Sequence, residues 1–196
     1  MALPGLSVNE KRYFLGIKGG KITYRPGRDA EPETYDIFQG EIKSIIKREA
    51  SINGAPTLFY DITFMNSGLT YVLSVPMAGS VARSIILSLA SVPNFHGKVI
   101  RISPYLKDGK YTNVSVYSNG ERVKWVIEKL PDVKTIVIGG KTYSDDSERI
   151  QCVENYVNVI NDRLRSEVDP ETGEVSGPVV DVEQDDFPGD SPENLG

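Results

Sequence analysis

The chain has 196 residues, of which 39% are hydrophobic and 25% are charged, as expected for a folded domain of ordinary size. The lone Cys152 excludes an internal disulfide, and no apolar run approaches the ~18 residues of a membrane span, so we expect a cytoplasmic protein. The net charge of −5 hides an asymmetry between two parts of the chain. Residues 1–144 carry 19 Lys/Arg and 12 Asp/Glu, whereas residues 145–196 carry 3 Lys/Arg and 15 Asp/Glu. A basic body with an acidic end favours a polyanionic partner, and an ordinary solvated surface with a solubilising tail is the alternative.

The first half of the chain predicts β-strands. Residues 1–11 are expected to form a flexible arm, and "RYFLGIKGGKITYRP" (12–26) predicts a β-hairpin that turns at its Gly-Gly pair. "YDIFQGEIKSIIKREA" (35–50) is a long β-prone run in which Gly40 predicts a bulge or a sharp bend. Apolar and polar residues alternate in 57–65, which predicts a strand. After a tight turn, 69–75 predicts a second strand whose apolar residues again lie on one side.

A helix is predicted over 80–92, where apolar residues recur at helical spacing, serines lie opposite, and Ser80 is a suitable N-cap. Two more strands, 98–106 and 111–118, are joined by "KDGK", and a run at 121–127 is expected to pair beside them. Three strands, a helix and a hairpin are the order of a five-stranded OB barrel. We therefore predict a mainly β fold with two helices, in which an OB-like barrel over 12–144 is extended by the N-terminal hairpin and extra strands.

The acidic end begins with a second predicted helix, over 145–166, after a short strand. Its apolar residues form one narrow stripe, Ile150, Val153, Val157, Ile160 and Leu164. We expect this stripe to pack on its own domain, and self-association of two such helices into a homo-oligomer is the alternative. Residues 167–196 contain ten acidic residues, one aromatic residue and no Lys or Arg, which predicts a disordered acidic tail.

The residue types needed for catalysis are sparse. "GGKT" (139–142) imitates a phosphate-binding loop, but Thr135 stands where that motif needs glycine, so a plain hairpin turn is predicted. His96 is the only histidine, which excludes a multi-histidine metal site. Asp145, Asp146 and Glu148 would suit a magnesium-dependent nuclease, yet helix capping already explains them. We expect a protein that is not an enzyme and has no catalytic residue, metal or cofactor.

Residues 101–125 interleave cations with aromatic rings, the two features that bind single-stranded nucleic acid without reading its sequence. In 111–117 two tyrosines lie on the polar side of a strand, where core packing does not explain them. OB barrels bind ligands across their second and third strands and between the first–second and fourth–fifth loops, here "EASINGA" and "KDGK". The candidate nucleic-acid-binding residues are Lys43, Lys47, Arg48, Phe59, Arg101, Tyr105, Lys107, Lys110, Tyr111, Tyr117, Lys124 and Trp125. The alternative is that the tyrosines are ordinary surface residues and that Trp125 covers the end of the barrel.

Four stretches, "YFLGIKGGKITYR", "YVLSVPMAGSVARSIILSLASV", "ISPYLKDGKYTNVSVYSNGERVKW" and "VIGGKTYSDDSE", resemble an OB-fold family of bacteriophage single-stranded DNA-binding proteins, over roughly residues 12–150. The resemblance implies coating of single-stranded DNA during replication or recombination, in the host cytoplasm if a phage encodes the chain. It also implies an acidic tail with a hydrophobic tip that recruits replication proteins. Asp185, Asp186 and Phe187 resemble that tip, although eight residues follow "DDFP".

We therefore expect a non-catalytic protein that binds single-stranded DNA and whose acidic tail competes with the nucleic acid. The alternative is a structural or adaptor module that uses the 150–164 stripe and the tail for protein contacts, without nucleic acid. The sequence leaves open the choice between DNA and RNA, the site size, the oligomeric state and the partner of the tail.

Overall fold

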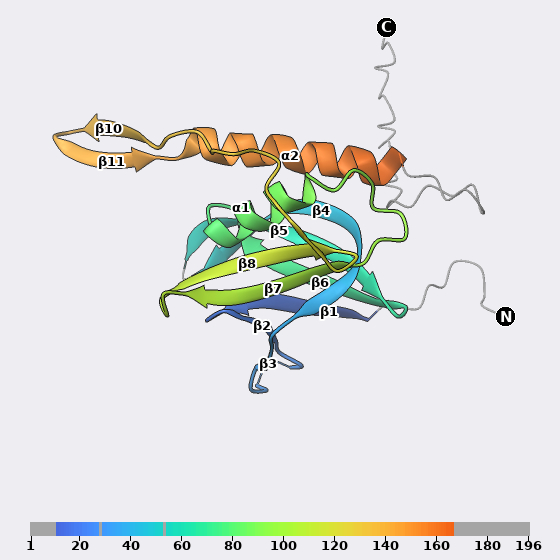
Figure 1. Ribbon diagram of the computed structural model, residues 1–196. Helices are drawn as coiled ribbons and strands as arrows, with labels where there is room; N and C mark the ends of the chain where they lie inside the picture. The colour runs from blue at the N-terminus through green and yellow to red at the C-terminus, as the bar shows by residue number, and fades with distance from the viewer. Residues whose placement is uncertain (1–10, 28, 53, 167–196) are drawn as a thin grey trace, which may run out of the picture.

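A computed structural model describes residues 11–27, 29–52 and 54–166, so most of the predicted arm and the whole predicted tail, with Asp185, Asp186 and Phe187, lie outside the described residues. Within this part the chain is mainly β with two helices, as predicted (Figure 1). No helix among the described residues is long and apolar enough to cross a membrane.

The described strands and helices follow one another in nearly the predicted order. They are β1 (Arg12–Lys18), β2 (Lys21–Tyr24), β3 (Glu33–Tyr35), β4 (Phe38–Ile52), β5 (Ala55–Asn66), β6 (Leu69–Pro76), α1 (Ser80–Leu89), β7 (Ile100–Lys107), β8 (Tyr111–Ser118), β9 (Glu121–Val123), β10 (Lys134–Ile138), β11 (Lys141–Asp145) and α2 (Ser147–Ser166). The first nine strands form one sheet in the order β3-β2-β1-β6-β5-β4-β7-β8-β9, and β10 and β11 form a separate hairpin.

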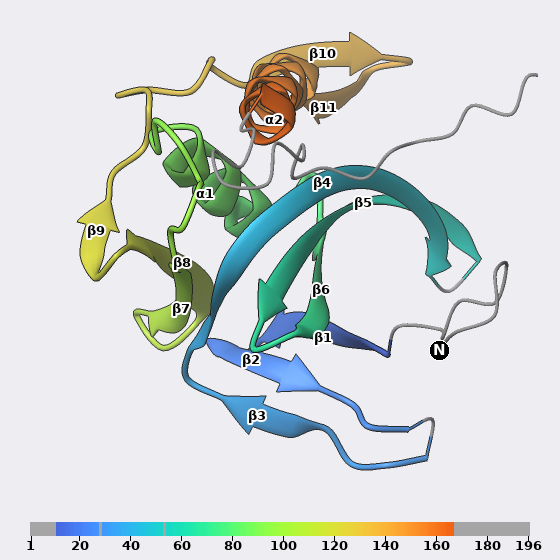
Figure 2. The ribbon, with the colours of Figure 1, turned by 90° about the vertical axis from the view of Figure 1, so that its right-hand side faces the viewer.

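The long strand β4 curls the sheet because it pairs with two neighbours in turn. Its first residues, Phe38–Gly40, pair with β7, and the rest of the strand pairs with β5, which produces the deep arc in Figure 2. Gly40 is buried at the change of partner, where an added Cβ would lie 3.0 Å from the Met65 carbonyl oxygen. The irregularity predicted at Gly40 falls slightly later, as a register shift between Ile42 and Ser44.

The predicted barrel is not closed. The order β4-β5-β6-α1-β7-β8 matches the predicted strands and helix, but the two ends of the sheet, β3 and β9, do not pair with each other. The reason is that β1 pairs in parallel with β6, Tyr13 opposite Tyr71, and so occupies the edge that a closing strand would need. The N-terminal hairpin therefore extends the sheet, as predicted, and leaves a seam between β2 and β7.

This seam is held by the turn between β1 and β2. The Gly20 backbone N–H donates to Thr112 Oγ1 at 3.3 Å, which joins the turn to β8. Gly20 has a φ of +72°, and a Cβ added there would lie 2.8 Å from the backbone nitrogen of Leu106. The Gly-Gly pair predicted to make a turn thus also allows two hairpins to approach closely.

Helix α1 is buried almost all round because it lies between the sheet and α2 (Figure 1). Ser84 and Ser88, expected on its polar side, are therefore buried at 8% and 4% exposure. The predicted cap at Ser80 is wrong, since Gly79 occupies the N-cap position without a side-chain hydrogen bond. The helix also ends earlier than predicted, at Leu89.

The apolar stripe of α2 packs on its own chain. Val153, Val157, Ile160 and Leu164 are buried and belong to the single hydrophobic core. The Asn161 side chain hydrogen-bonds both the backbone N–H and the carbonyl of Ile45, at 3.1 and 2.8 Å, and so fastens α2 to β4. Packing on its own domain is confirmed, and the alternative of pairing two α2 stripes is wrong because this stripe is already covered.

Tyr60 provides a testable consequence of this packing. Its side chain is 1% exposed, and its hydroxyl has no hydrogen-bond partner among the described residues. Burial, and next the nearby Glu154 charge, raise the pKa of Tyr60 above its ordinary value near 10. Since the unfolded chain releases this proton above about pH 10 and the folded protein keeps it, the free energy of unfolding is expected to fall as the pH rises past that value.

Tyr60→Phe is expected to remove this alkaline loss and to leave the free energy of unfolding at pH 7 unchanged or higher, because it removes a buried unsatisfied hydroxyl. Urea denaturation at pH 7 and at about pH 10.5 measures both quantities. Tyr143→Phe, at an exposed tyrosine, is the matched control. An alkaline loss of equal size in Tyr60→Phe and in the native chain would contradict the prediction.

Candidate nucleic-acid interface

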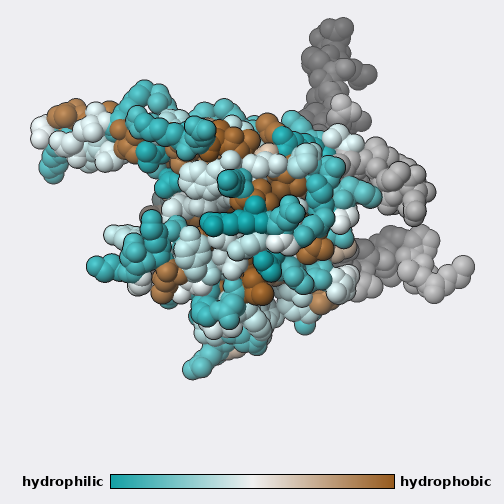
Figure 3. Space-filling view, viewed as in Figure 1, coloured by the Kyte–Doolittle hydropathy of each residue, from teal (hydrophilic) through white to brown (hydrophobic). Residues whose placement is uncertain are grey.

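One surface gathers most of the predicted binding residues, and we call it the β7–β9 face. Strand alternation directs Ile100, Ile102, Val114 and Val116 into the core and sends the residues between them outward. Figure 3, in the view of Figure 1, shows mostly hydrophilic side chains over β7 and β8. The outward residues of this face are Arg101, Ser103, Tyr105, Lys107, Tyr111, Asn113, Ser115, Tyr117 and Arg122.

The centre of the face is a tyrosine between two arginines. The strand register places Tyr117 opposite Arg101 on one side and Arg122 on the other, and Gln39 lies beyond Arg101. The Arg101 Cζ atom lies 4.1 Å from the centroid of the Tyr117 ring, within cation–π range. Arg101 Nε is buried and has no hydrogen-bond partner among the described residues. The Arg101 Nε–H is therefore not accessible, and an anion beside this ring would be bound by the terminal N–H groups of the two guanidinium groups.

Two further rings lie toward the tip of the β7–β8 hairpin. Tyr105 and Tyr111 are 41% and 68% exposed, and they pair in register with Asn113 and Lys107. Lys110 is exposed in the turn between the strands. Exposed rings on the polar side of a strand offer flat surfaces on which nucleobases can stack.

Ion pairing divides the cations considered for this interface, Arg122 included, into two groups. Lys43, Lys47 and Arg48 each pair with a carboxylate of the same chain, Glu41, Glu154 and Asp61 respectively. In contrast, the four cations of the β7–β9 face and its turn have no ion pair within the described part of the chain: Arg101, Lys107, Lys110 and Arg122. No carboxylate lies among the outward residues of this face. The cations of the second group are not neutralised by a carboxylate of the described chain, and Lys124 shares this property.

Arg48 and Phe59 belong to a separate cluster on β4, β5 and β6. Asp61, at 4% exposure, accepts from Arg48 Nε at 2.5 Å and from Ser74 Oγ at 2.6 Å. The Arg48 Cζ atom lies 5.4 Å from the Phe59 ring centroid. This network supplies hydrogen bonds to a buried carboxylate and joins three neighbouring strands. A stabilising role therefore explains these contacts of Arg48 and Phe59, and no ligand is needed to account for them.

Lys124 and Trp125 follow β9 and lie beyond the strand. The predicted run 121–127 pairs with β8 only through Glu121–Val123, because Val126 N–H then donates to the Leu87 carbonyl of α1. Lys124 lines a groove of about 550 Å³ together with Lys98 and Arg122. Trp125 is 41% exposed, follows the end of β9 and does not line this groove.

The sequence reasoning missed Arg122 and Lys98, although a signal for Arg122 was present. The Asn119-Gly120 turn joins paired strands, and a two-residue turn there places Arg122 opposite Tyr117. It also missed a second basic surface on β1 and β2, a hollow of about 490 Å³ lined by Phe14, Lys18 and Arg25 among others. The Phe14 side chain is 61% exposed there, because it points to the opposite face of β1 from the buried Leu15.

The residues considered for catalysis have structural roles or lie apart. Asp145 Oδ1 accepts from the Ser147 backbone N–H at 3.0 Å at the start of α2, Asp146 pairs with Arg83, and Glu148 pairs with Lys134. The side-chain and backbone hydrogen bonds from Ser147 lower the pKa of Asp145. "GGKT" forms the hairpin turn between β10 and β11, as predicted.

His96 is exposed, and within the described residues no three His, Cys, Asp or Glu side chains come together as a metal site. No family model, no curated protein and no solved structure matches this chain, so the chemistry of its own surfaces is what indicates a function.

Proposed function

We propose that this protein binds and coats single-stranded DNA through the β7–β9 face and catalyses no reaction. The observation that carries the proposal is the alternation of unpaired cations with rings on one face whose outward strand residues include no carboxylate. Cations bind the phosphates, and rings stack on bases of any identity, which is what sequence-independent binding requires.

The dimensions of the face are consistent with this role. The eight residues of β7 extend over about 26 Å, at about 3.3 Å per residue. Its cations and rings lie along this length, from the Lys107–Lys110 turn to Arg101 and Arg122. A face of this length suits the lower end of the ~4–16 nucleotides that one OB-type domain covers.

The acidic residues 167–196 complete the proposal. Their ten carboxylates would compete with DNA for the β7–β9 face at low ionic strength, and Asp185, Asp186 and Phe187 would recruit replication or recombination proteins. The alternative adaptor role is weaker, because the 150–164 stripe on which it relied is buried against the chain's own core.

The salt dependence of binding tests the proposal. Fluorescence anisotropy with labelled oligo-dT is expected to give a log K against log salt slope of about −3, since four unpaired cations each contribute ~−0.7 on a single strand. Arg101→Gln with Arg122→Gln is expected to make this slope shallower by about 1.4. The matched control is Lys47→Gln with Lys129→Gln, which removes two cations that already have carboxylate partners. Absence of binding at low salt, or a slope that the arginine variant leaves unchanged, would contradict the proposal.

A further inference from the structure

The β10–β11 hairpin has no place in the nucleic-acid proposal. It projects beyond the N-terminal end of α2, away from the curved sheet (Figures 1 and 2). All its strand residues except Asp145 are exposed, and neither strand packs extensively on another described element. Because an isolated two-stranded hairpin is marginally stable in water, this hairpin calls for a covering partner.

The two faces of the hairpin differ. The register pairs Ile136 with Tyr143 and Ile138 with Lys141, so these four side chains share one face, on which the paired Lys134 and Asp145 lie at the base of the hairpin. Ile136, Ile138 and Tyr143 are 40%, 62% and 47% exposed, and Figure 3 shows hydrophobic side chains at this projecting end. Projecting apolar side chains between a lysine at the tip and charged residues at the base are typical of a protein contact surface.

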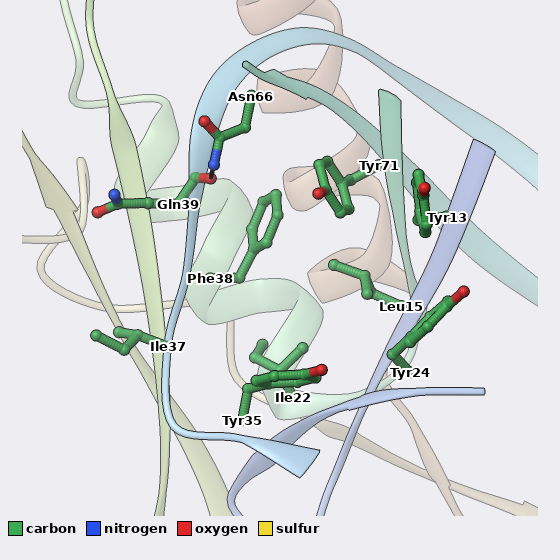
Figure 4. A pocket seen from close by; sticks show the side chains of 10 residues that line it. All are labelled: Tyr13, Leu15, Ile22, Tyr24, Tyr35, Ile37, Phe38, Gln39, Asn66 and Tyr71. Atoms are coloured by element: carbon green, nitrogen blue, oxygen red, sulfur yellow. Dashed lines mark hydrogen bonds between the residues drawn. The ribbon is translucent and has the colours of Figure 1, made fainter. Parts of the chain in front are cut away.

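A complementary hollow lies at the mouth of the open barrel. This aromatic cavity, of about 370 Å³, is lined by rings from β1, β2, β3, β4 and β6 that point toward one another in Figure 4: Tyr13, Tyr24, Tyr35, Phe38 and Tyr71. The rings of Tyr13 and Tyr71 stack with centroids 5.2 Å apart, which leaves the cavity walled by ring faces and edges. Its apolar floor suits aliphatic side chains.

The cavity lies beside the free edge of strand β3. In the nine-stranded sheet β3 pairs only with β2, so its other edge presents unpaired backbone groups. Tyr35 belongs both to β3 and to the cavity lining, and Glu33 shares its side of the strand. The segment 29–36 carries four acidic residues and no Lys or Arg.

We propose that the β10–β11 hairpin of one copy adds to the β3 edge of a second copy, with Ile136 and Ile138 over the aromatic cavity. Addition of a strand to a free edge supplies backbone hydrogen bonds, and alternate side chains enter the adjacent pocket. The same alternation places Lys141, which has no ion pair among the described residues, on the face of the extended sheet that carries Glu33, whose carboxylate accepts from the Tyr35 hydroxyl.

The contact joins two different surfaces and so is head-to-tail. The hairpin and β3 lie on opposite sides of the molecule in both ribbon views (Figures 1 and 2). One chain therefore cannot fill its own cavity with its own hairpin. Each added copy presents a new free hairpin and a new free cavity, so the contact repeats and builds an open array, or a ring where the rotation between copies closes.

Sedimentation velocity of the full chain without nucleic acid tests this contact. The native chain is expected to associate as its concentration rises. Ile138→Asp and Tyr35→Asp are each expected to raise the dissociation constant at least about tenfold, because each places a charge in an apolar contact. Both side chains are largely exposed, so both variants are expected to fold, which circular dichroism checks. An equimolar mixture of the two variants is expected to form dimers and nothing larger, since it retains one intact hairpin and one intact cavity.

Matched controls place the same charge on the opposite faces. Thr142→Asp on the hairpin and Thr34→Asp on β3 are expected to leave the association unchanged. Three results would overturn the proposal: a native chain that stays monomeric at every concentration, an association that Ile138→Asp does not weaken, or a mixture of variants that stays monomeric. A Tyr35→Asp variant that associates as strongly as the native chain would likewise contradict the proposal, because a hairpin-to-hairpin contact does not need the cavity.

Discussion

Tyr105→Ala combined with Tyr111→Ala is expected to weaken binding of oligo-dT by about 2–6 kcal/mol, because each ring that stacks on a base contributes about 1–3 kcal/mol. Both rings are exposed on the β7–β9 face, at 41% and 68%, and neither belongs to the hydrophobic core. Fluorescence anisotropy at one fixed, stated salt concentration measures the loss, because the affinity itself varies with salt.

The double variant is expected to keep the salt slope of the native chain, because it removes rings and leaves every cation in place. Its free energy of unfolding is expected to stay within about 0.5 kcal/mol of the native value, as for other surface substitutions. Tyr143→Ala, on the projecting hairpin, is the matched control and is expected to bind a short oligo-dT, which covers one copy, as the native chain does. Equal affinity of the native chain and the double variant would remove these two rings from the interface.

Gly20→Ala is expected to lower the free energy of unfolding by about 2–5 kcal/mol. A side chain at a positive φ costs about 1–2 kcal/mol, and overpacking against fixed backbone costs about 1–3 kcal/mol more. The atoms that the new Cβ would meet are backbone atoms of Leu106 and Tyr105, at 2.8 and 2.9 Å, which cannot rotate away. The β1–β2 turn must therefore move off the β7–β8 hairpin and open the seam.

Gly19→Ala separates these two contributions. Gly19 also has a positive φ, +58°, but a Cβ there would meet no atom within 4 Å. Its cost is expected to be the conformational part alone, about 1–2 kcal/mol. Urea denaturation of both variants provides the comparison. Equal losses in the two variants would show that the contact between the two hairpins contributes no stability.

The two proposed surfaces have a joint consequence. If copies bind head-to-tail while each covers a short stretch of DNA through its β7–β9 face, each bound copy favours the next. Binding to long oligo-dT is then cooperative in the native chain, and Ile138→Asp removes the cooperativity while leaving the affinity for a short oligonucleotide unchanged. The two activities are therefore separable by substitutions on different strands.

The strands, turns and helices follow from local patterns that the sequence carries by itself. Alternation along β5 and β8, the Gly-Gly and Asn-Gly pairs, and the apolar stripe of α2 each predict an element that the structure contains. Such patterns suffice because side-chain direction repeats every two residues in a strand and every 3.6 in a helix. The tyrosines on the outward side of β8 were found for the same reason.

Tertiary structure alone decided which of the predicted cations remain available. Lys47 meets Glu154 of α2, and Arg48 meets the buried Asp61, while Arg101 meets a ring and no described carboxylate. Tertiary structure also decided that the barrel stays open, because β1 pairs with the edge of β6 that a closing strand would need. Pairings between distant residues depend on how the strands are ordered in space, and a periodic pattern along one strand contains no record of its neighbours.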